Sequence, residues 1–302
     1  MKTIAGIVPI VAAVFDDRGR VDLEGFARLV RHLTGTGAKA LTLFGLATEF
    51  YKLTDEEKER MMRVLLAETS ASPDVAGIVS ITHHSWEVAA VQAQQAEQAG
   101  ADALMLLPPF FLAPSADAIL AHARKVAQAV SIPVIVQYAP NQTGVRIEPE
   151  LFVRLREDCP NARYVKVETQ PPGKFAARLH ELSGGSVETL VGYAGVQMID
   201  VLQRGSVGIQ PGCSFTEVYV ALYGMFRRGE LDELNALFGR LLPYISYWMQ
   251  SVELIIKAEK AILHKRGLIA SSYCRQPDYR LDAFEERMID AFLQEFVAYW
   301  GK

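Results

Sequence analysis

Short apolar runs alternate with amphipathic stretches along most of the sequence, and this alternation limits the folds that the chain can adopt. Each run is apolar almost throughout, which is typical of a parallel strand covered on both faces. Eight runs have this character: Gly6–Ala12, Ala40–Phe44, Val75–Ile81, Ala103–Leu107, Val134–Tyr138, Tyr164–Val167, Thr189–Gly192 and Ser206–Gln210. Eight such strands with helices between them predict a closed (β/α)₈ TIM barrel.

The stretches between these runs carry the start and stop signals of helices. Thr54 and Glu57 have the spacing of a capping box, in which each side chain bonds a backbone N–H of the first turn. Gly37, Gly100 and Gly205 each stand just before a predicted strand, where a glycine in the left-handed conformation ends a helix. The same strand–helix unit is therefore used repeatedly.

The strand pattern stops at about Phe215, and only helical patterns follow. Four helices are predicted: Phe215–Arg228, Leu231–Met249, Val252–Lys265 and Leu281–Trp300. These are too many for the eighth helix of a barrel. We therefore predict a barrel over residues 1–225, which carries the active site, and a C-terminal helical subdomain over residues 226–302, packed on the barrel or on a neighbouring subunit.

The composition of the 302 residues excludes several classes of protein. A formal charge of -4 without a basic run argues against nucleic-acid binding. Cys159, Cys213 and Cys274 lie far apart and form neither a metal spacing nor a disulfide framework, so we expect a reducing cytoplasm and no metal. No apolar run is long enough for a membrane span. The apolar N-terminus is interrupted by Pro9, and we interpret it as a strand and not a signal peptide.

A lysine stands inside the sixth predicted strand, and it is the strongest chemical signal in the sequence. Burying an ammonium is costly unless it is paired or has lost its proton, and a neutral amine can attack a ketone to form a Schiff base. The period of two in a strand places Lys166 and Glu168 on the same face. The alternative is a strand-end lysine that points at solvent and pairs with Glu168 as a structural ion pair.

Active sites of (β/α)₈ barrels lie at the carboxyl ends of the strands, and this rule selects the remaining candidates. The adjacent histidines His83 and His84 would point opposite ways on an extended segment, so we do not expect them to bind a metal together. Lys166 and Glu168 are the candidate catalytic residues. The predicted substrate-binding residues are Ala47, Thr48, His83, Gln137, Gly192 and Gln210.

These motifs resemble the dihydrodipicolinate synthase / N-acetylneuraminate lyase superfamily of class I, Schiff-base lyases, over essentially the whole chain. The resemblance is carried by the Gly45 to Glu49 loop, the Pro140 to Gly144 turn and Lys166 on the sixth strand. It implies that Lys166 forms an imine with a 2-keto acid and that the backbone around Ala47 and Thr48 holds the substrate carboxylate. It also implies a dimer or tetramer, and we expect no cofactor.

Several positions depart from the synthases of that superfamily. Leu46 and Ala47 stand where the synthases have two hydroxyl residues, and Gln137 takes the place of the fifth-strand tyrosine. Phe111 replaces a tyrosine of the fourth-strand loop, and Gln142 replaces an arginine. The tyrosine–threonine proton relay of the synthases is therefore absent, and a true dihydrodipicolinate synthase is not expected.

One branch, the 2-keto-3-deoxyarabonate dehydratases, is more similar. Its motifs correspond here to Thr82-His83, to Val136-Gln137-Tyr138-Ala139-Pro140 and to Lys166-Val167-Glu168-Thr169. Tyr138 replaces an acidic residue of that branch, and we expect it to pack in the core. The resemblance implies dehydration of a 2-keto-3-deoxy sugar acid. The alternatives are a pyruvate-dependent aldolase or a dihydrodipicolinate synthase-like enzyme, and then a non-catalytic paralogue that binds a keto acid.

Overall fold

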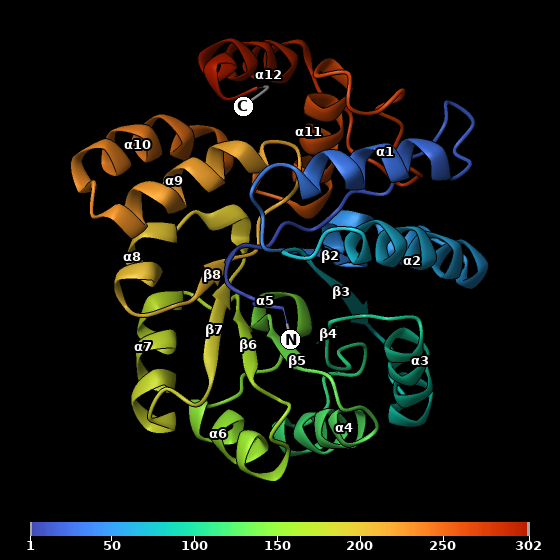
Figure 1. The fold of residues 1–302 in the computed structure, drawn as a ribbon, viewed down its shortest axis with the longest axis vertical. Helices are drawn as coiled ribbons and strands as arrows, with labels where there is room; N and C mark the ends of the chain where they lie inside the picture. The colour runs from blue at the N-terminus through green and yellow to red at the C-terminus, as the bar shows by residue number, and fades with distance from the viewer. Residues whose placement is uncertain (1, 301–302) are drawn as a thin grey trace. The chain divides into compact units, whose positions relative to one another are not determined.

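The computed structural model describes residues 2–300 and contains all eight predicted strands (Figure 1). They are parallel and follow the order β1-β8-β7-β6-β5-β4-β3-β2 in a nearly closed barrel, with helices between them, so the predicted (β/α)₈ fold is confirmed. Their bounds are β1 (Gly6–Ile7), β2 (Ala40–Leu43), β3 (Ala76–Ile81), β4 (Ala103–Leu106), β5 (Val134–Tyr138), β6 (Tyr164–Val167), β7 (Glu188–Val191) and β8 (Gly208–Ile209).

The α-helices alternate with the strands and then continue alone to the C-terminus. They are α1 (Leu23–Thr34), α2 (Asp55–Ser70), α3 (Trp86–Gln98), α4 (Ala116–Gln128), α5 (Pro140–Thr143), α6 (Pro149–Asp158), α7 (Pro172–Ser183), α8 (Met198–Gln203), α9 (Thr216–Arg228), α10 (Leu231–Trp248), α11 (Val252–Lys265) and α12 (Ala283–Glu295). Four 3₁₀ turns complete the structure: η1 (Leu46–Thr48), η2 (Phe50–Lys52), η3 (Tyr193–Gly195) and η4 (Val297–Tyr299).

β1 and β8 are shorter than predicted by more than one residue, and a proline follows the end of each. β1 ends at Ile7, two residues before Pro9, and β8 ends at Ile209, two residues before Pro211. Proline has no N–H to donate to a neighbouring strand, so regular pairing stops there. Beyond Pro9, Ile10 makes only isolated bridges, one of them to Thr42.

The chain divides into two compact units by its internal contacts. The first, here the central unit, comprises Met1–Ala5 and Ala76–Gln210; the second, the terminal unit, comprises Gly6–Val75 and Pro211–Lys302. Residues 1, 301 and 302 lie outside the described residues. The boundary predicted between residues 225 and 226 stays a prediction.

The central unit holds β3 to β8, and its sheet has two chemically different faces. Tyr138 of β5 packs against Phe152 of α6 and Phe175 of α7, with ring centroids 5.5 and 4.8 Å apart, so its face is covered by helices and Tyr138 lies in the core as expected. The neighbouring Gln137 therefore points to the opposite, inner face. Residues in register share a face, which places Lys166 on the inner face beside Gln137.

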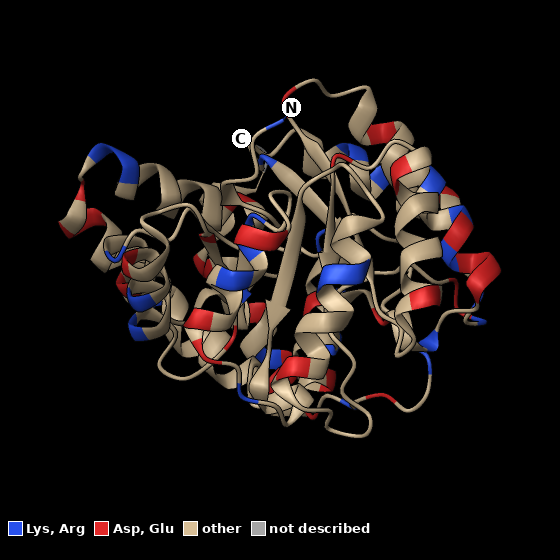
Figure 2. Ribbon diagram, turned by 90° about the horizontal axis from the view of Figure 1, so that it is seen from below, with Lys and Arg blue, Asp and Glu red and all other residues tan. Residues whose placement is uncertain are grey.

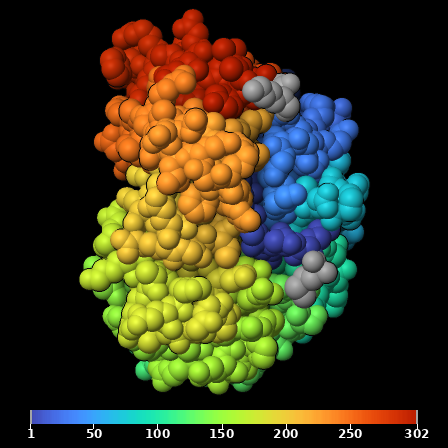
Figure 3. Space-filling model, turned by 60° about the vertical axis from the view of Figure 1, so that its left-hand side comes forward, coloured from blue at the N-terminus to red at the C-terminus, as the bar shows by residue number. Residues whose placement is uncertain are grey.

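The terminal unit begins with β1 and β2 and ends with the helices after the barrel. The capping box predicted at Thr54 and Glu57 is present at the start of α2. α11 has the predicted bounds, whereas α12 starts at Ala283 because Asp282 caps it, and it gives way after Glu295 to a 3₁₀ turn. In the space-filling view the C-terminal helices form one continuous orange-to-red surface (Figure 3).

The described helices show the mixed charge and the lack of long apolar segments that the composition indicated. Basic and acidic residues are interspersed on the helices without a large region of one sign (Figure 2). Across residues 2–300, no helix combines the length and the apolar character that crossing a membrane requires.

Candidate active site

Lys166 and Glu168 form a buried amine–carboxylate pair on the inner face of the central unit. Lys166 is the third residue of β6, and Glu168 follows the strand directly, so the period of two brings both side chains to one side. The Lys166 Nζ lies 3.3 Å from the Glu168 Oε1. Lys166 is 5% exposed and Glu168 is 8% exposed. The lysine therefore does not point at solvent, as the alternative interpretation of the sequence required.

Gln137 approaches the same carboxylate from the neighbouring strand. Its register partner is Lys166, and its Nε2 donates to the Glu168 Oε2 at 2.6 Å. The two oxygens of Glu168 thus have different partners, the amide of Gln137 on one side and the amine of Lys166 on the other. The structure shows that the amide of Gln137 contacts the predicted catalytic acid. The substrate-binding role suggested for Gln137 by the sequence stays a prediction.

Gly192 follows β7 and makes room for this carboxylate. A Cβ built on Gly192 would lie 2.0 Å from the Glu168 Oε1 and 2.6 Å from its carboxyl carbon. Real atoms do not approach so closely, so any side chain at this position would displace the carboxylate. The structure shows that the Glu168 carboxylate occupies the space that a side chain at Gly192 would fill. The predicted role of Gly192 in substrate binding stays a prediction.

The two residues that directly follow Gly192, Tyr193 and Ala194, have an unusual backbone conformation. Tyr193 and Ala194 have φ angles of 52° and 48°, in the left-handed region that costs residues other than glycine about 1–3 kcal/mol each. The Tyr193 hydroxyl accepts a hydrogen bond of 2.8 Å from the Asn141 amide, which links the segments after β5 and β7. Sequence reasoning missed this turn, because tyrosine and alanine do not favour such angles.

Two hydroxyl groups of β3 and its following residue are buried without a hydrogen-bond partner among the described residues, Ser80 Oγ and Thr82 Oγ1. Ser80 pairs in register with Met105, which pairs with Ile135, and Ile135 shares its face with Gln137. Ser80 and Thr82 are thus on the inner face. Buried polar groups are rarely left unpaired, so these hydroxyls are candidates for binding a ligand or water. Ser80 was missed, although a serine in an apolar strand was a usable signal.

The other predicted residues of the central unit are His83 and Gln210. The His83 Nδ1 accepts a 3.0 Å hydrogen bond from the Ser85 N–H, which holds the ring within its own turn. The His83 carbonyl contacts the His122 Nε2 at 3.0 Å, and burial lowers the pKa of His122. Gln210 is buried directly after β8, and its N–H donates to the Val191 carbonyl. Their roles in substrate binding stay predictions.

Ala47 and Thr48 lie in η1 of the terminal unit, after β2. The Thr48 N–H donates to the Gly45 carbonyl at 2.9 Å, and the Thr48 hydroxyl donates to the Val11 carbonyl at 2.7 Å. Both donors of Thr48 are therefore used within the protein. The N–H groups at the start of a helical turn have no partner inside it, so Ala47 and not Thr48 keeps the character expected of an anion-binding backbone.

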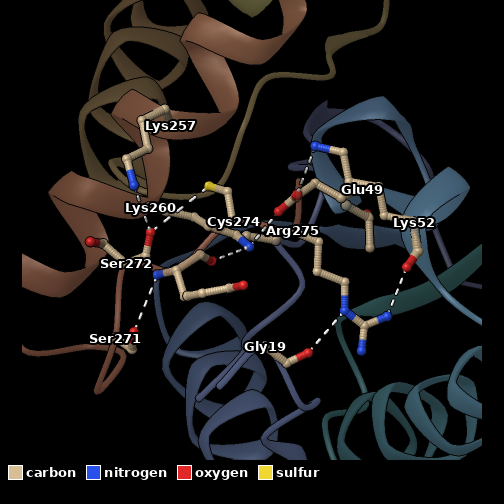
Figure 4. A network of polar contacts seen from close by, with 12 residues as sticks. Gly19, Glu49, Lys52, Lys257, Lys260, Ser271, Ser272, Cys274 and Arg275 are labelled. Carbon is tan, nitrogen blue, oxygen red and sulfur yellow. Dashed lines mark hydrogen bonds and ion pairs between the residues drawn. The ribbon is translucent and has the colours of Figure 1, made fainter. Parts of the chain in front are cut away.

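The same unit contains a second buried lysine, which the sequence analysis did not single out. Lys260 of α11 pairs with Glu49 and donates to the Tyr273 carbonyl at 3.0 Å (Figure 4). Burial lowers the pKa of Lys260, and the charge of Glu49 opposes that shift. Glu49 is also paired with Lys52 at 3.2 Å. Since Lys260 is engaged by a carboxylate and a carbonyl, it is a structural lysine, and Lys166 remains the candidate nucleophile.

No metal centre is found in the part of the chain that the structure describes: residues 2–300 contain no group of three or more His, Cys, Asp or Glu side chains that could hold an ion. Cys159, Cys213 and Cys274 are buried and unbridged. Burial raises the pKa of the Cys274 thiol to about 11, which disfavours the reactive thiolate.

The chain is similar to known proteins over most of its length. The model of the dihydrodipicolinate synthetase family matches residues 3–295. The L-2-keto-3-deoxyarabonate dehydratase of Azospirillum brasilense is 28% identical over 277 residues, which are 90% of this chain and 88% of the relative. The 4-hydroxy-tetrahydrodipicolinate synthase of Acidothermus cellulolyticus is 33% identical over 268 residues, which are 87% of this chain and 83% of the relative.

The fold is shared as well. The crystal structure of the dihydrodipicolinate synthase from Rhodopseudomonas palustris matches 97% of this chain and 99% of its own, with a TM-score of 0.89 at 24% identity. The family match extends over nearly every described residue, and it includes both units. The chain therefore belongs to the dihydrodipicolinate synthetase family, whose members are lyases.

Proposed function

We propose that this protein is a Schiff-base-forming lyase that dehydrates a 2-keto-3-deoxy sugar acid. The observation that carries the proposal is the buried pair of Lys166 and Glu168, 3.3 Å apart on the inner face of β6. An amine and a carboxylate in contact, both shielded from water, are a nucleophile and a proton carrier within reach of the same substrate carbon.

In the proposed reaction the Lys166 amine condenses with the C2 ketone and releases water. The resulting iminium withdraws electrons from C3, and Glu168 removes a C3 proton, whose bonding electrons form an enamine. The enamine then expels the C4 hydroxyl, which leaves as water with the proton that Glu168 returns. Hydrolysis of the imine restores Lys166 and releases a product with an unbroken carbon chain.

The residues predicted to bind substrate are proposed again here, each on its own position in the chain. The backbone N–H of Ala47 binds the C1 carboxylate, and Thr48, whose own donors are used within the protein, fixes the turn that presents it. In the central unit, Gln210 and the turn at His83 contribute polar groups to substrate binding. The unpartnered hydroxyls of Ser80 and Thr82 bind hydroxyl groups of the sugar acid.

A second candidate is an enzyme that makes or cleaves a carbon–carbon bond through a pyruvate enamine, as an aldolase or a synthase does. The identity of 33% to a 4-hydroxy-tetrahydrodipicolinate synthase favours it, since this exceeds the 28% identity to the dehydratase. Glu168 favours the dehydratase. In the absence of the tyrosine relay, it is the acid–base group in contact with the candidate nucleophile.

The first test is borohydride trapping with a panel of 2-keto acids, including pyruvate and 2-keto-3-deoxy sugar acids, read by intact mass. A reduced adduct that is lost in Lys166→Arg supports the Schiff base. The absence of any adduct with the wild-type protein would contradict it and would favour a non-catalytic keto-acid-binding paralogue. Product analysis then separates the two reactions, because an aldolase releases free pyruvate and a dehydratase does not.

Glu168→Gln tests the proton carrier separately. The amide keeps the shape of the side chain but cannot accept the C3 proton, so trapping should persist and turnover should fall about 10²–10⁴-fold. Full turnover by this variant would remove Glu168 from the mechanism.

The oligomeric state and location of the protein are also proposed, from its composition and its family. We expect a cytoplasmic homo-oligomer, a dimer or a tetramer, that needs no cofactor and binds no nucleic acid. Sedimentation or light scattering of the purified chain would give the number of subunits.

A further inference from the structure

We infer that Gln137 and Gly192 are positioning residues that fix the orientation of the Glu168 carboxylate, so that its Oε1 is the oxygen that carries the proton. The inference rests on the proposed function, because it assigns a task to each oxygen of the proposed acid–base group. It is carried by contacts that lie within the central unit.

The first step is the contact of Gln137. Its Nε2 donates to the Glu168 Oε2 at 2.6 Å, and both side chains are buried. An amide nitrogen only donates, so this contact requires Oε2 to act as an acceptor. Because this donor already uses one lone pair of Oε2, a proton that reaches the carboxylate binds more readily to the other oxygen, Oε1.

The second step is the position of Oε1. This oxygen lies 3.3 Å from the Lys166 Nζ, where the substrate carbons next to the imine would be. Because C3 is bonded to the imine carbon C2, the oxygen nearest the amine is the one that can reach the C3 proton. It can later give the same proton to the departing C4 oxygen.

The third step is the space that Gly192 leaves. Its missing Cβ would fall 2.0 Å from Oε1, whereas the other residues that contact the carboxylate do so through hydrogen bonds or charge. Gln137 thus holds one oxygen, and Gly192 leaves open the place of the other. Removing either feature should rotate or shift the carboxylate without touching the lysine.

Register explains why these three residues meet. Gln137 pairs with Lys166 across β5 and β6, and Lys166 pairs with Leu190 across β6 and β7. Moving two residues along β6 and β7 reaches Glu168 and Gly192, which share the inner face. Gln137 lies in β5, and Glu168 and Gly192 directly follow the ends of β6 and β7, so strand register sets how the three residues meet.

The test uses Gln137→Met, which keeps the length of the side chain and removes the donor, and Gly192→Ala, which adds the single carbon that collides with Oε1. Both variants should form the borohydride-trapped adduct to the same extent as the wild type. Both should lose about 10- to 100-fold in kcat with little change in KM, the range that a misplaced reacting group costs.

A matched control separates positioning from a general loss of structure. The control is Tyr138→Phe, the next residue of β5, whose side chain packs on the opposite face against Phe152 and Phe175. It removes the hydroxyl that accepts a 3.3 Å hydrogen bond from the Ile147 N–H, away from the carboxylate, and should leave kcat and KM unchanged.

A double variant gives the decisive comparison. If Gln137 acts through Glu168, then Gln137→Met should cost almost nothing more in a Glu168→Gln background, because residues that act as a unit are not additive. An additive loss or an unchanged kcat in Gln137→Met would overturn the inference while the trapped adduct keeps the proposed function intact. No adduct with the wild-type protein would overturn both.

Discussion

Glu259 offers a sharp test of the structure, because its environment makes the stability of the protein depend on pH. This residue of α11 is 3% exposed, and its Oε2 accepts a hydrogen bond of 2.7 Å from the Ser214 N–H. Burial raises the pKa of the Glu259 carboxyl from its ordinary 4.5 to about 7, against the opposing effects of the Ser214 hydrogen bonds and the Arg266 charge. The folded protein thus holds a proton that the unfolded chain releases.

The size and sign of the effect follow from that difference. The stabilisation is fully present below pH 4.5, and it is lost as the pH rises through about 7. A tenfold change in proton affinity corresponds to about 1.4 kcal/mol, so the rise in pKa from 4.5 to about 7 corresponds to about 3 kcal/mol of unfolding free energy. Glu259→Gln replaces the carboxyl with a neutral group of the same size, so this part of the pH dependence should disappear.

The assay is urea or thermal unfolding of both proteins at several pH values between 5 and 8. The stability of the variant relative to the wild type should increase across this range, because only the wild type loses the contribution of the bound proton. The other groups that titrate are present in both proteins and cancel in the comparison. Parallel curves for the two proteins over the whole range would refute the reasoning.

Two further predictions concern the terminal unit. Lys260→Met leaves Glu49 buried with Lys52 as its remaining ionic partner, which should cost about 3–5 kcal/mol of unfolding free energy in urea titrations; adding Glu49→Gln should restore part of it, and no recovery would contradict the pairing. Arg275→Lys loses the bidentate hydrogen bonds to the Glu57 carboxylate, which should lower the unfolding free energy by about 1–3 kcal/mol at neutral pH. Hydrogen bonds from Arg275 lower the pKa of Glu57 to about 2, so the wild type should lose this stabilisation as the pH falls from 4.5 through 2, and the variant should lose less.

The sequence was sufficient to predict the parts of the fold that follow from local patterns. Strands buried on both faces are apolar throughout, so all eight could be recognised, and the helix after Thr54 followed from its capping box. The predicted C-terminal ends of β1 and β8 were wrong, because Pro9 and Pro211 have no N–H to donate and regular pairing stops before them although the sequence stays apolar.

The candidate site also has some contacts that follow from local patterns and others that do not. The shared face of Lys166 and Glu168 follows from the period of a strand, and the structure agrees. The contact between Gln137 and Glu168 depends on the register of two strands, which no local pattern specifies. The pairing of Glu49 with Lys260 joins residues far apart in the sequence, and it could be seen only in three dimensions.

The pairing of Lys260 with Glu49 means that a C-terminal helix supports a loop near the start of the chain. Glu49 directly follows η1, the turn that contains Ala47 and Thr48, and its φ of 56° is in the left-handed region. Lys260 supplies a compensating charge from α11, which contacts η1 (Figure 4). A chain shortened before residue 252 would keep every strand of the barrel and still lose this support. α11 therefore stabilises the loop after β2, and removing it should disturb that loop.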